Sequence, residues 1–466
     1  MNNEEQLRDL WRIASLPMEA LGFAQLNGSD PVFPSSFPVG SAAQVSIAAA
    51  ALAACELGYL RNGIRQQVEV DMLHAAVECS GWFSLEGHEP NAWDDFSGLY
   101  RCADGYVRVH ANFAHHREGA LRLLGLAPAT ATRADAQRAL LLWPALDVEQ
   151  AAAERGLVAT ALRSFEQWDA TAQGQAIRAQ PLMTISRIGD AAPLGLPPLK
   201  PNQGPLTGIR VLDLTRVLAG PVAGRALAAH GAEVLLINSP NLPNIDAIAD
   251  TSRGKRSAHL DLLTEPGRAG LWQLIDDAHV FSQGYRPGGL AALGYSPEAL
   301  AERRPGIVYV SLTAYGTQGP WALRRGFDSL VQTAMGFNHA EGEYAGDGVP
   351  RALPMQILDQ ASGYLMAFGA AAALCRQQRD GGSWHVEVSL AQTGYWLRNM
   401  GRIANGLHRR KPDFAPFLET SSSGFGELRA VRPSGQLTRS QAGYTLPSMP
   451  PGSALPAWIQ THKPKA

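Results

Sequence analysis

The sequence predicts an α/β protein whose main part is a Rossmann-like open parallel sheet, and three observations support this fold class. Short apolar, β-branched runs alternate with helical stretches after residue 205. Glycine-containing turns follow several of these runs, and a proline-rich stretch separates them from the preceding residues. Alternation of this kind indicates parallel strands with helices on both faces of the sheet.

The predicted elements follow one another from residue 209 onward. Residues 209–214 (IRVLDL) predict a strand, 222–230 a helix and 234–237 the next strand, with later strands at 278–281 and 307–312. The stretch 212–238 therefore resembles strand, glycine turn, helix and strand. It lacks the G-x-G-x-x-G of a dinucleotide-binding fold, so the ligand of this turn needs another explanation.

Four segments are predicted along the chain: an N-terminal segment over 1–190, a linker over 191–205, the α/β domain over 206–400 and a C-terminal arm over 401–466. Prolines and glycines interrupt any helix or strand pattern in the linker. The longest apolar stretch, 45–55, is mostly alanine and is about half as long as a bilayer-spanning helix. We expect a buried helix there.

Composition excludes several classes of partner. The 466 residues carry 40 Lys and Arg against 42 Asp and Glu, and the formal net charge of -2 gives no reason to expect nucleic acid binding. The polar, acidic N-terminus does not resemble a secretory signal, so we expect a cytoplasmic protein without a membrane partner. Four cysteines without a C-x-x-C pair indicate reduced thiols and predict no metal site.

A weak internal repeat relates the N-terminal segment to the α/β domain. An alanine-rich helix, a glycine and a short alternating strand occur twice, and a gap-free overlay places Gly63 on Gly381 and residues 68–70 on 386–388. Two ordinary helix–strand units could also converge on this pattern. In the same register, Ser41 takes the place of Asp359.

Two groups of charged residues are candidate site residues. Asp359 directly precedes a long helix, where an aspartate either caps the helix or, kept ionised by the helix dipole, acts as a nucleophile toward an acyl group. Arg253, Lys255 and Arg256 surround a glycine. Such cations either lie in a solvated turn or hold a phosphate-bearing ligand.

Seven consecutive motifs resemble those of one enzyme family. They are G-x-R-V-L-D-L-T-R-V-L-A-G-P (208–221), R-G-K-R-S-A-x-L-D-L (253–262), Y-R-P-G (285–288), L-G-Y-S-P (293–297), S-L-T-A-Y-G with a later G-P (311–320), G-F-D (326–328) and L-D-x-x-x-G (358–363). Their order and spacing resemble the class III CoA-transferases, which include formyl-CoA and carnitine CoA-transferases and the 2-methylacyl-CoA racemases.

The resemblance implies a function and a set of site residues. Asp359 matches the family's nucleophile, which would form an aspartyl-acyl mixed anhydride and an enzyme-CoA thioester while CoA moves from an acyl-CoA to a carboxylic acid. Coenzyme A would be a substrate, with no permanently bound cofactor, and the chain would form a homodimer. The residues expected to bind CoA include two of the three cations above and are Leu218, Ala219, Arg253, Lys255, Leu260, Asp261, Tyr285, Arg286, Thr313, Ala314, Tyr315 and Gly316.

Departures from the family pattern leave two alternatives. Racemases carry a histidine where this chain has Phe327, so a 2-methylacyl-CoA racemase or acyl-CoA isomerase would lack its second base. Leu218 replaces a polar residue of several transferases, which leaves a non-catalytic acyl-CoA-binding subunit as the other alternative. The N-terminal segment resembles the later part of a family chain and is expected to contain a smaller α+β domain. The chain would then be a rearranged or partly duplicated member of the family, and Ser41 would be inactive.

Overall fold

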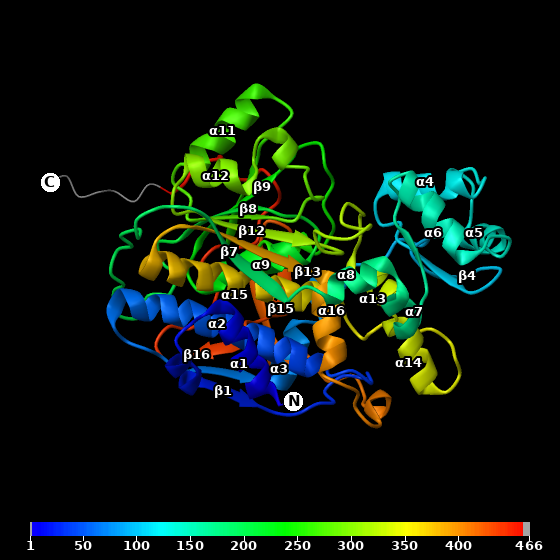
Figure 1. Ribbon diagram of the computed structural model, residues 1–466, viewed down its shortest axis with the longest axis horizontal. Coiled ribbons are helices and arrows are strands. Elements are labelled where there is room, and N and C mark those ends of the chain that lie inside the picture. The colour runs from blue at the N-terminus through cyan, green and yellow to red at the C-terminus, as the bar shows by residue number, and fades with distance from the viewer. Residues whose placement is uncertain (1, 460–466) are drawn as a thin grey trace.

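A seven-stranded sheet forms the centre of the protein, as the computed structural model shows for residues 2–459 (Figure 1). Its strand order is β10-β9-β8-β11-β12-β13-β7. All neighbours are parallel except β7, which runs antiparallel to β13. The bounds are β7 (Met183–Gly189), β8 (Arg210–Leu214), β9 (Glu233–Asn238), β10 (Lys255–His259), β11 (Val280–Gln283), β12 (Val308–Thr313) and β13 (Ser383–Ser389). The predicted parallel α/β sheet is therefore confirmed.

Both faces of the sheet are buried around its central strands, which explains the nearly continuous apolar runs of β9 and β12. Val211 and Val280 contribute to the larger core, with α9 (Ala219–Ala229) and α15 (Ile357–Asp380). Leu212 and Phe281 point to the other face, against α11 (Glu265–Ile275) and α12 (Pro297–Arg303). Alternate residues of each strand thus serve different cores.

The internal repeat has a structural counterpart. Helix α2 (Val39–Asn62) begins and ends at positions that match α15 in the predicted register, and the two helices pack against each other. In both units a strand, β2 (Val68–Asp71) or β13, leads directly into a helix, α3 (Met72–Glu78) or α16 (Leu390–Asn399). Helix α2 is long and apolar enough for a membrane span, but 89% of its most apolar window is buried, as in the core helix predicted there.

The N-terminal segment also contains a smaller α+β domain, which lies to one side of the main sheet (Figure 1). It consists of β4 (Gly98–Arg101), β5 (Tyr106–Val109), α4 (Ala114–Leu123), α5 (Arg133–Leu140), α6 (Ala145–Glu154) and β6 (Ala159–Ala161). This domain has its own apolar core. Helices α7 (Phe165–Ala170) and α8 (Ala172–Arg178) then lead into β7. The N-terminal segment thereby completes one edge of the main sheet.

The predicted C-terminal arm pairs with the N-terminal segment. Strand β15 (Gly426–Val431) lies between β14 (Leu418–Ser423) and β3 (Phe83–Leu85), and β16 (Gly435–Leu437) joins β2 and β1 (Ala24–Asn27). The remaining helices are α1 (Asn3–Ala14), α10 (Ile248–Thr251), α13 (Asp328–Met335) and α14 (Phe337–Ala345). Residues 460–466 of the arm lie outside the described residues. In the described part, all four cysteines are buried and free.

Candidate active site

Two cavities meet at Asp359. One, of about 350 Å³, is lined by Arg216, Arg286, Arg324 and Arg325 and is called the arginine cavity. The other, of about 400 Å³, is called the His110 cavity after the histidine in its wall. Val217, Leu218, Phe327 and Asp359 border both cavities. The site lies beyond the carboxyl ends of β8, β11 and β12, where open α/β sheets bind ligands.

The turn after β8 forms the wall between the two cavities. Val217 has a φ of 75°, a left-handed conformation that is unusual for a β-branched residue. Strain of this kind persists where the surrounding structure holds it, often at functional sites. Here Val217 is held between the end of β8 and the start of α9, and its neighbour Leu218 lines both cavities. The turn singled out in the sequence therefore borders the site.

Asp359 is held in the first turn of α15 with its carboxyl group open to the cavities. Its backbone N–H donates to Asp328 Oδ2 at 2.9 Å, so Asp328 satisfies a free N–H group at the start of this helix. Gln356 is the residue before the helix, so the alternative in which Asp359 is the N-cap is wrong. The Asp359 carboxyl accepts no hydrogen bond from residues 2–459, although the residue is only 8% exposed.

The two aspartates share a strongly perturbed proton equilibrium. Burial raises the pKa of Asp328 to about 7, although hydrogen bonds from the backbone of Asp359 and the side chain of Gln332 act to lower it. Burial and then the charge of Asp328 raise the pKa of Asp359 well above its ordinary value. The helix dipole was expected to keep Asp359 ionised, but burial beside a second carboxylate outweighs the dipole. Because only Asp328 accepts hydrogen bonds, we infer that Asp359 holds the proton.

Six of the predicted CoA-binding residues line the arginine cavity: Leu218, Ala219, Tyr285, Arg286, Thr313 and Ala314. Arg216, Arg286 and Arg325 have no carboxylate partner among the described residues, whereas Arg324 lies 3.5 Å from Glu149. Unpaired guanidinium groups in a cavity are suited to phosphate or carboxylate ligands. No role was predicted for Arg216, because the motif 208–221 that contains it does not show where this side chain points.

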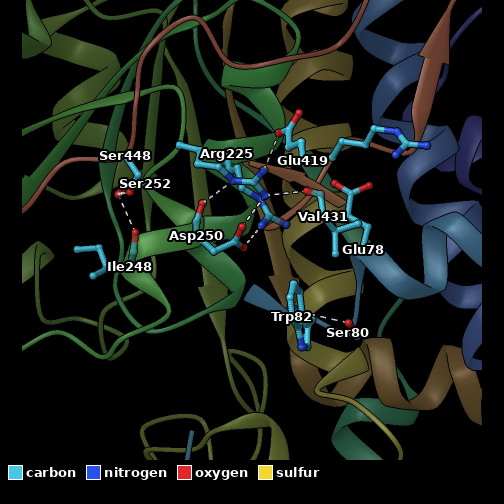
Figure 2. A network of polar contacts seen from close by, with 12 residues as sticks. Glu78, Ser80, Trp82, Arg225, Ile248, Asp250, Ser252, Glu419, Val431 and Ser448 are labelled. Carbon is cyan, nitrogen blue, oxygen red and sulfur yellow. Dashed lines mark hydrogen bonds and ion pairs between the residues drawn. The ribbon is translucent and has the colours of Figure 1, made fainter. Parts of the chain in front are cut away.

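The predicted phosphate-binding cations lie elsewhere. Lys255 Nζ contacts Asp213 at 2.7 Å, and both side chains are fully buried. Arg253 pairs with Asp250 and with Glu419 of the C-terminal arm. Figure 2 shows Asp250 beside Arg225, its second buried arginine partner, and the exposed Glu419 at the edge of this network. Arg253 and Lys255 are therefore held in ion pairs inside the protein, neither in a solvated turn nor at a phosphate site. Arg256 is partly exposed and donates to the backbone oxygen of Ala457 at 2.6 Å.

Four further predicted residues are not part of the arginine cavity. Asp261 accepts a hydrogen bond from Asn241 at 3.0 Å, and Leu260 precedes it after the end of β10. Tyr315 is buried against Trp321, and Gly316 borders a separate cavity of about 30 Å³. The structure thus brings the first part of the T-A-Y-G turn to the site and directs the second part away from it.

The N-terminal segment supplies most of one wall of the His110 cavity. His110 stacks on Phe327 with ring centroids 4.0 Å apart, and Gly81, Trp93 and Asn112 line the same cavity. Burial lowers the pKa of His110 to about 3, which keeps its imidazole neutral. Sequence reasoning missed His110. The only available signal was the alternation in Y-V-R-V-H (106–110), which places His110 on the face of the strand opposite to Val107 and Val109.

In the sequence, the polar and helical surroundings of the adjacent His115 and His116 predict solvated rather than catalytic side chains. His115 and His116 both line the arginine cavity, and His116 is buried against Phe113. That expectation is therefore wrong for His116, because α4 packs toward the cavity through this residue. In the described range 2–459, no group of three or more His, Cys, Asp or Glu residues is arranged to hold a metal ion.

Gly363 fixes the position of the helix that carries Asp359. A Cβ atom at this residue would lie 2.5 Å from the backbone oxygen of Ala219 and 2.8 Å from Val222. We expect Gly363→Ala to lower the free energy of unfolding by about 1–3 kcal/mol, because α9 and α15 must separate. Urea unfolding will measure this loss. Gly105→Ala, where a Cβ atom meets nothing within 4 Å, is the control, and equal effects of the two changes would contradict the argument.

Comparison with known proteins places this geometry in a family. A family model described as CoA-transferase family III matches residues 16–193 and 206–413. A probable fatty acyl-CoA transferase of Mycobacterium tuberculosis is 34% identical over 232 residues, which are 46% of this chain and 58% of the relative. A succinate–glutarate CoA-transferase of Agrobacterium fabrum is 32% identical over 267 residues, 51% of this chain and 66% of the relative.

The matches to individual proteins are partial. An acyl-CoA transferase of Gibberella moniliformis is 36% identical over 53% of this chain and 45% of its own length. The chain spans about half the length of the curated relatives it matches. A solved CAIB/BAIF family protein from Brucella suis is 27% identical over 48% of this chain and 65% of its own, with a TM-score of 0.39. Since the family model covers most of the sequence, the chain belongs to CoA-transferase family III.

Proposed function

We propose that this chain transfers coenzyme A from an acyl-CoA to a carboxylic acid, with Asp359 as the nucleophile. The observation that carries the proposal is the position of Asp359. Its buried carboxyl group, which has no hydrogen-bond partner among residues 2–459, lies where the arginine cavity meets a second cavity. The arginine cavity suits the phosphates of CoA, and the His110 cavity leaves room for the acyl group. The names of the relatives agree with this class of reaction.

The proposed reaction begins with deprotonated Asp359. Its carboxylate attacks the thioester carbonyl, the C–S bond breaks, and CoA leaves as a thiolate, so that an aspartyl-acyl anhydride remains. The thiolate then attacks the aspartyl carbonyl, which releases the first acid and forms an enzyme-CoA thioester. The acceptor carboxylate attacks this thioester and displaces the CoA thiolate, which gives a second anhydride. The thiolate then attacks the acyl carbonyl of the second anhydride, which releases the new acyl-CoA and restores Asp359.

One observation bears on the racemase alternative. His110 stacks on Phe327, so an imidazole from the N-terminal segment lies beside the position where racemases carry their histidine. A base must accept a proton readily near the working pH, and burial lowers the pKa of His110 to about 3. His110 is therefore a weak base. The structure thus favours transfer over racemisation, while the unpartnered Asp359 favours an enzyme over a binding subunit.

We also propose that the N-terminal segment is a partial second copy of the family unit. Support comes from the matching bounds of α2 and α15 and from the family match to residues 16–193. Ser41 occupies the place of the nucleophile and donates a hydrogen bond to Asp30. A serine cannot form the anhydride, so this proposal assigns one catalytic aspartate to each chain. Homodimer formation and a cytoplasmic location stay predictions.

Trapping the anhydride tests the proposed function. The protein is incubated with short acyl-CoAs, treated with hydroxylamine and digested, and the peptide that contains Asp359 is examined by mass spectrometry. A hydroxamate on Asp359 is the expected result. If CoA binds but no hydroxamate forms with any donor, the transferase mechanism is wrong, and exchange of solvent deuterium at the acyl α-carbon will then show whether the chain is a racemase.

Arg325 provides a test of the CoA site. Its guanidinium has no carboxylate partner in the described structure and contacts only His116 Nε2, at 3.3 Å. We expect Arg325→Gln to raise the Kd for CoA about tenfold through the loss of a charge-assisted phosphate contact. The Kd for pantetheine, which has no phosphate, should not change.

Isothermal titration of both ligands measures this effect. Arg303→Gln is the matched control, because Arg303, at the end of α12, pairs with Asp276 and does not line the arginine cavity. Equal weakening of CoA and pantetheine binding by Arg325→Gln would contradict a phosphate contact at this residue.

A further inference from the structure

Lys255 and Asp213 form an ion pair on the face of the sheet that α9 covers. Lys255, Val234 and Val211 lie in one row across β10, β9 and β8. Asp213 points to the same face as Val211, because alternate residues of a strand do so. The distance from Lys255 Nζ to Asp213 Oδ2 is 2.7 Å, and neither side chain is exposed. Helix α9 packs directly on the pair, since a Cβ atom at Gly224 would overlap the Asp213 carboxylate.

This ion pair holds both ends of the turn between β8 and α9. Lys255 Nζ also donates a hydrogen bond, at 2.8 Å, to the backbone oxygen of Pro221 in the first turn of α9. Asp213 Oδ1 accepts hydrogen bonds from the Thr215 backbone N–H, at 3.1 Å, and from the Thr215 hydroxyl group. Thr215 also packs on Gly220, where a Cβ atom would lie 2.5 Å from Thr215 Cγ2. The turn is thus tied to the sheet before and after its central residues.

The central residues of the turn border the site. Val217 and Leu218 line both cavities beside Asp359, and Val217 has the left-handed φ of 75°. This conformation is unfavourable for a β-branched residue, so the turn keeps it only while its ends are held. The start of α9 also contacts α15, because a Cβ atom at Gly363 would lie 2.5 Å from the backbone oxygen of Ala219. A shift of the turn would therefore move the cavity wall relative to Asp359.

The Lys255–Asp213 pair is a poor source of stability, because two buried charges lose their hydration and apolar residues of the same size would not. The pair instead provides geometry, since its hydrogen bonds fix the distance from the sheet to each end of the turn. Neither residue lines the two cavities. Resting on the proposed function, we propose that Lys255 is a positioning residue. It acts through Asp213 and holds the 215–221 turn where a bound thioester meets Asp359.

Thr215 offers the mildest test of this proposal in the full chain. Thr215→Val keeps the shape of the side chain and loses the hydroxyl group that bonds to Asp213, whereas Thr215→Ser keeps the hydroxyl group. We expect kcat to fall about tenfold in Thr215→Val and less than about threefold in Thr215→Ser, with the Kd for CoA nearly unchanged in both.

Acetyl-, butyryl- and succinyl-CoA serve as donors in this test, with propionate as acceptor. The formation of propionyl-CoA gives kcat, and isothermal titration gives the Kd for CoA. An equal or larger loss of kcat in Thr215→Ser would show that packing on Gly220 matters rather than the tie to Asp213, and would overturn the proposal.

A double-mutant cycle tests Lys255 itself. We expect Lys255→Met to lower kcat about 10²-fold, which is the usual effect of a misplacement of about 1 Å at a reacting centre. Glycine adopts the left-handed conformation without strain, so a turn with Val217→Gly depends less on the tie. The loss caused by Lys255→Met should therefore be about tenfold smaller in the Val217→Gly background. Equal losses in the two backgrounds would overturn the proposal.

Two further variants separate positioning from general damage. Lys255→Met combined with Asp213→Asn leaves no unpaired buried charge and replaces Lys255→Met in the cycle if that variant does not fold. Arg65→Met breaks an ion pair with the buried Glu56, away from both cavities, and should keep its kcat. An equal loss of kcat in Arg65→Met would overturn the proposal. If the unsubstituted protein forms neither propionyl-CoA nor an Asp359 hydroxamate, the proposed function fails, and this proposal with it.

Discussion

Replacing Asp359 by asparagine is expected to lower kcat for CoA transfer by at least about 10³-fold, as is usual when a covalent nucleophile is removed. An amide cannot form the anhydride that keeps the acyl group activated. The arginine cavity stays intact in this variant, so the Kd for CoA should change little. Steady-state kinetics and isothermal titration on the same preparation separate these effects. Retained turnover in Asp359→Asn would refute the mechanism.

The same substitution should have an effect on stability that depends on pH. The pKa of Asp359 is raised in the folded protein, so between the unfolded and folded pKa values the folded state binds more protons than the unfolded state. The free energy of unfolding therefore decreases as the pH rises through this range. An asparagine at this position does not titrate, so its contribution to the decrease in the free energy of unfolding disappears.

Urea unfolding at two pH values measures this effect. We expect Asp359→Asn to be more stable than the unsubstituted protein at pH 8, with a smaller difference near pH 4. Asp276→Asn, at an exposed pair with Arg303, is the control. A variant that is less stable at pH 8 would assign Asp359 a structural role.

Local sequence patterns were sufficient to predict four strands of the central sheet. The strands β8, β9, β11 and β12 lie at or beside the apolar runs predicted there. Parallel strands bring the turns that follow them to one edge of the sheet. Leu218, Arg286 and Thr313 therefore meet although they belong to three separate turns. Asp359 was placed beside them by the family resemblance, and the structure adds that Gly363, one turn later, allows α9 to cross closely.

The rest of the site depends on contacts that local patterns do not contain. A basic run such as 253–256 has the same sequence appearance whether its cations are solvated or buried. Lys255 is buried because Asp213, on a different strand, neutralises it. His110 and Phe327 lie far apart in sequence, and only the packing of the smaller domain against the main sheet stacks their rings. The elevated pKa of Asp359 likewise depends on Asp328, which the sequence motif included without a role.

Asp328→Asn is expected to make CoA transfer less dependent on pH. With both aspartates present, the negative charge of Asp328 favours the protonated form of Asp359, so the rate should fall toward low pH, by up to about tenfold per pH unit. Asparagine removes the charge, lowers the pKa of Asp359 and keeps an oxygen that can accept the hydrogen bond from its N–H. The pH profile of kcat/KM from 5.5 to 8.5 should therefore flatten.

Asp328→Ala separates the charge from the hydrogen bond. It also removes the negative charge, but it leaves the N–H of Asp359 without an acceptor, which should lower the free energy of unfolding by about 1–3 kcal/mol. Flattened profiles in both variants, with lost stability in the alanine variant alone, would assign the two effects to different properties of one carboxylate. Parallel profiles for the unsubstituted protein and Asp328→Asn would instead show that Asp328 does not control the ionisation of the nucleophile, and burial alone would then explain the raised pKa of Asp359.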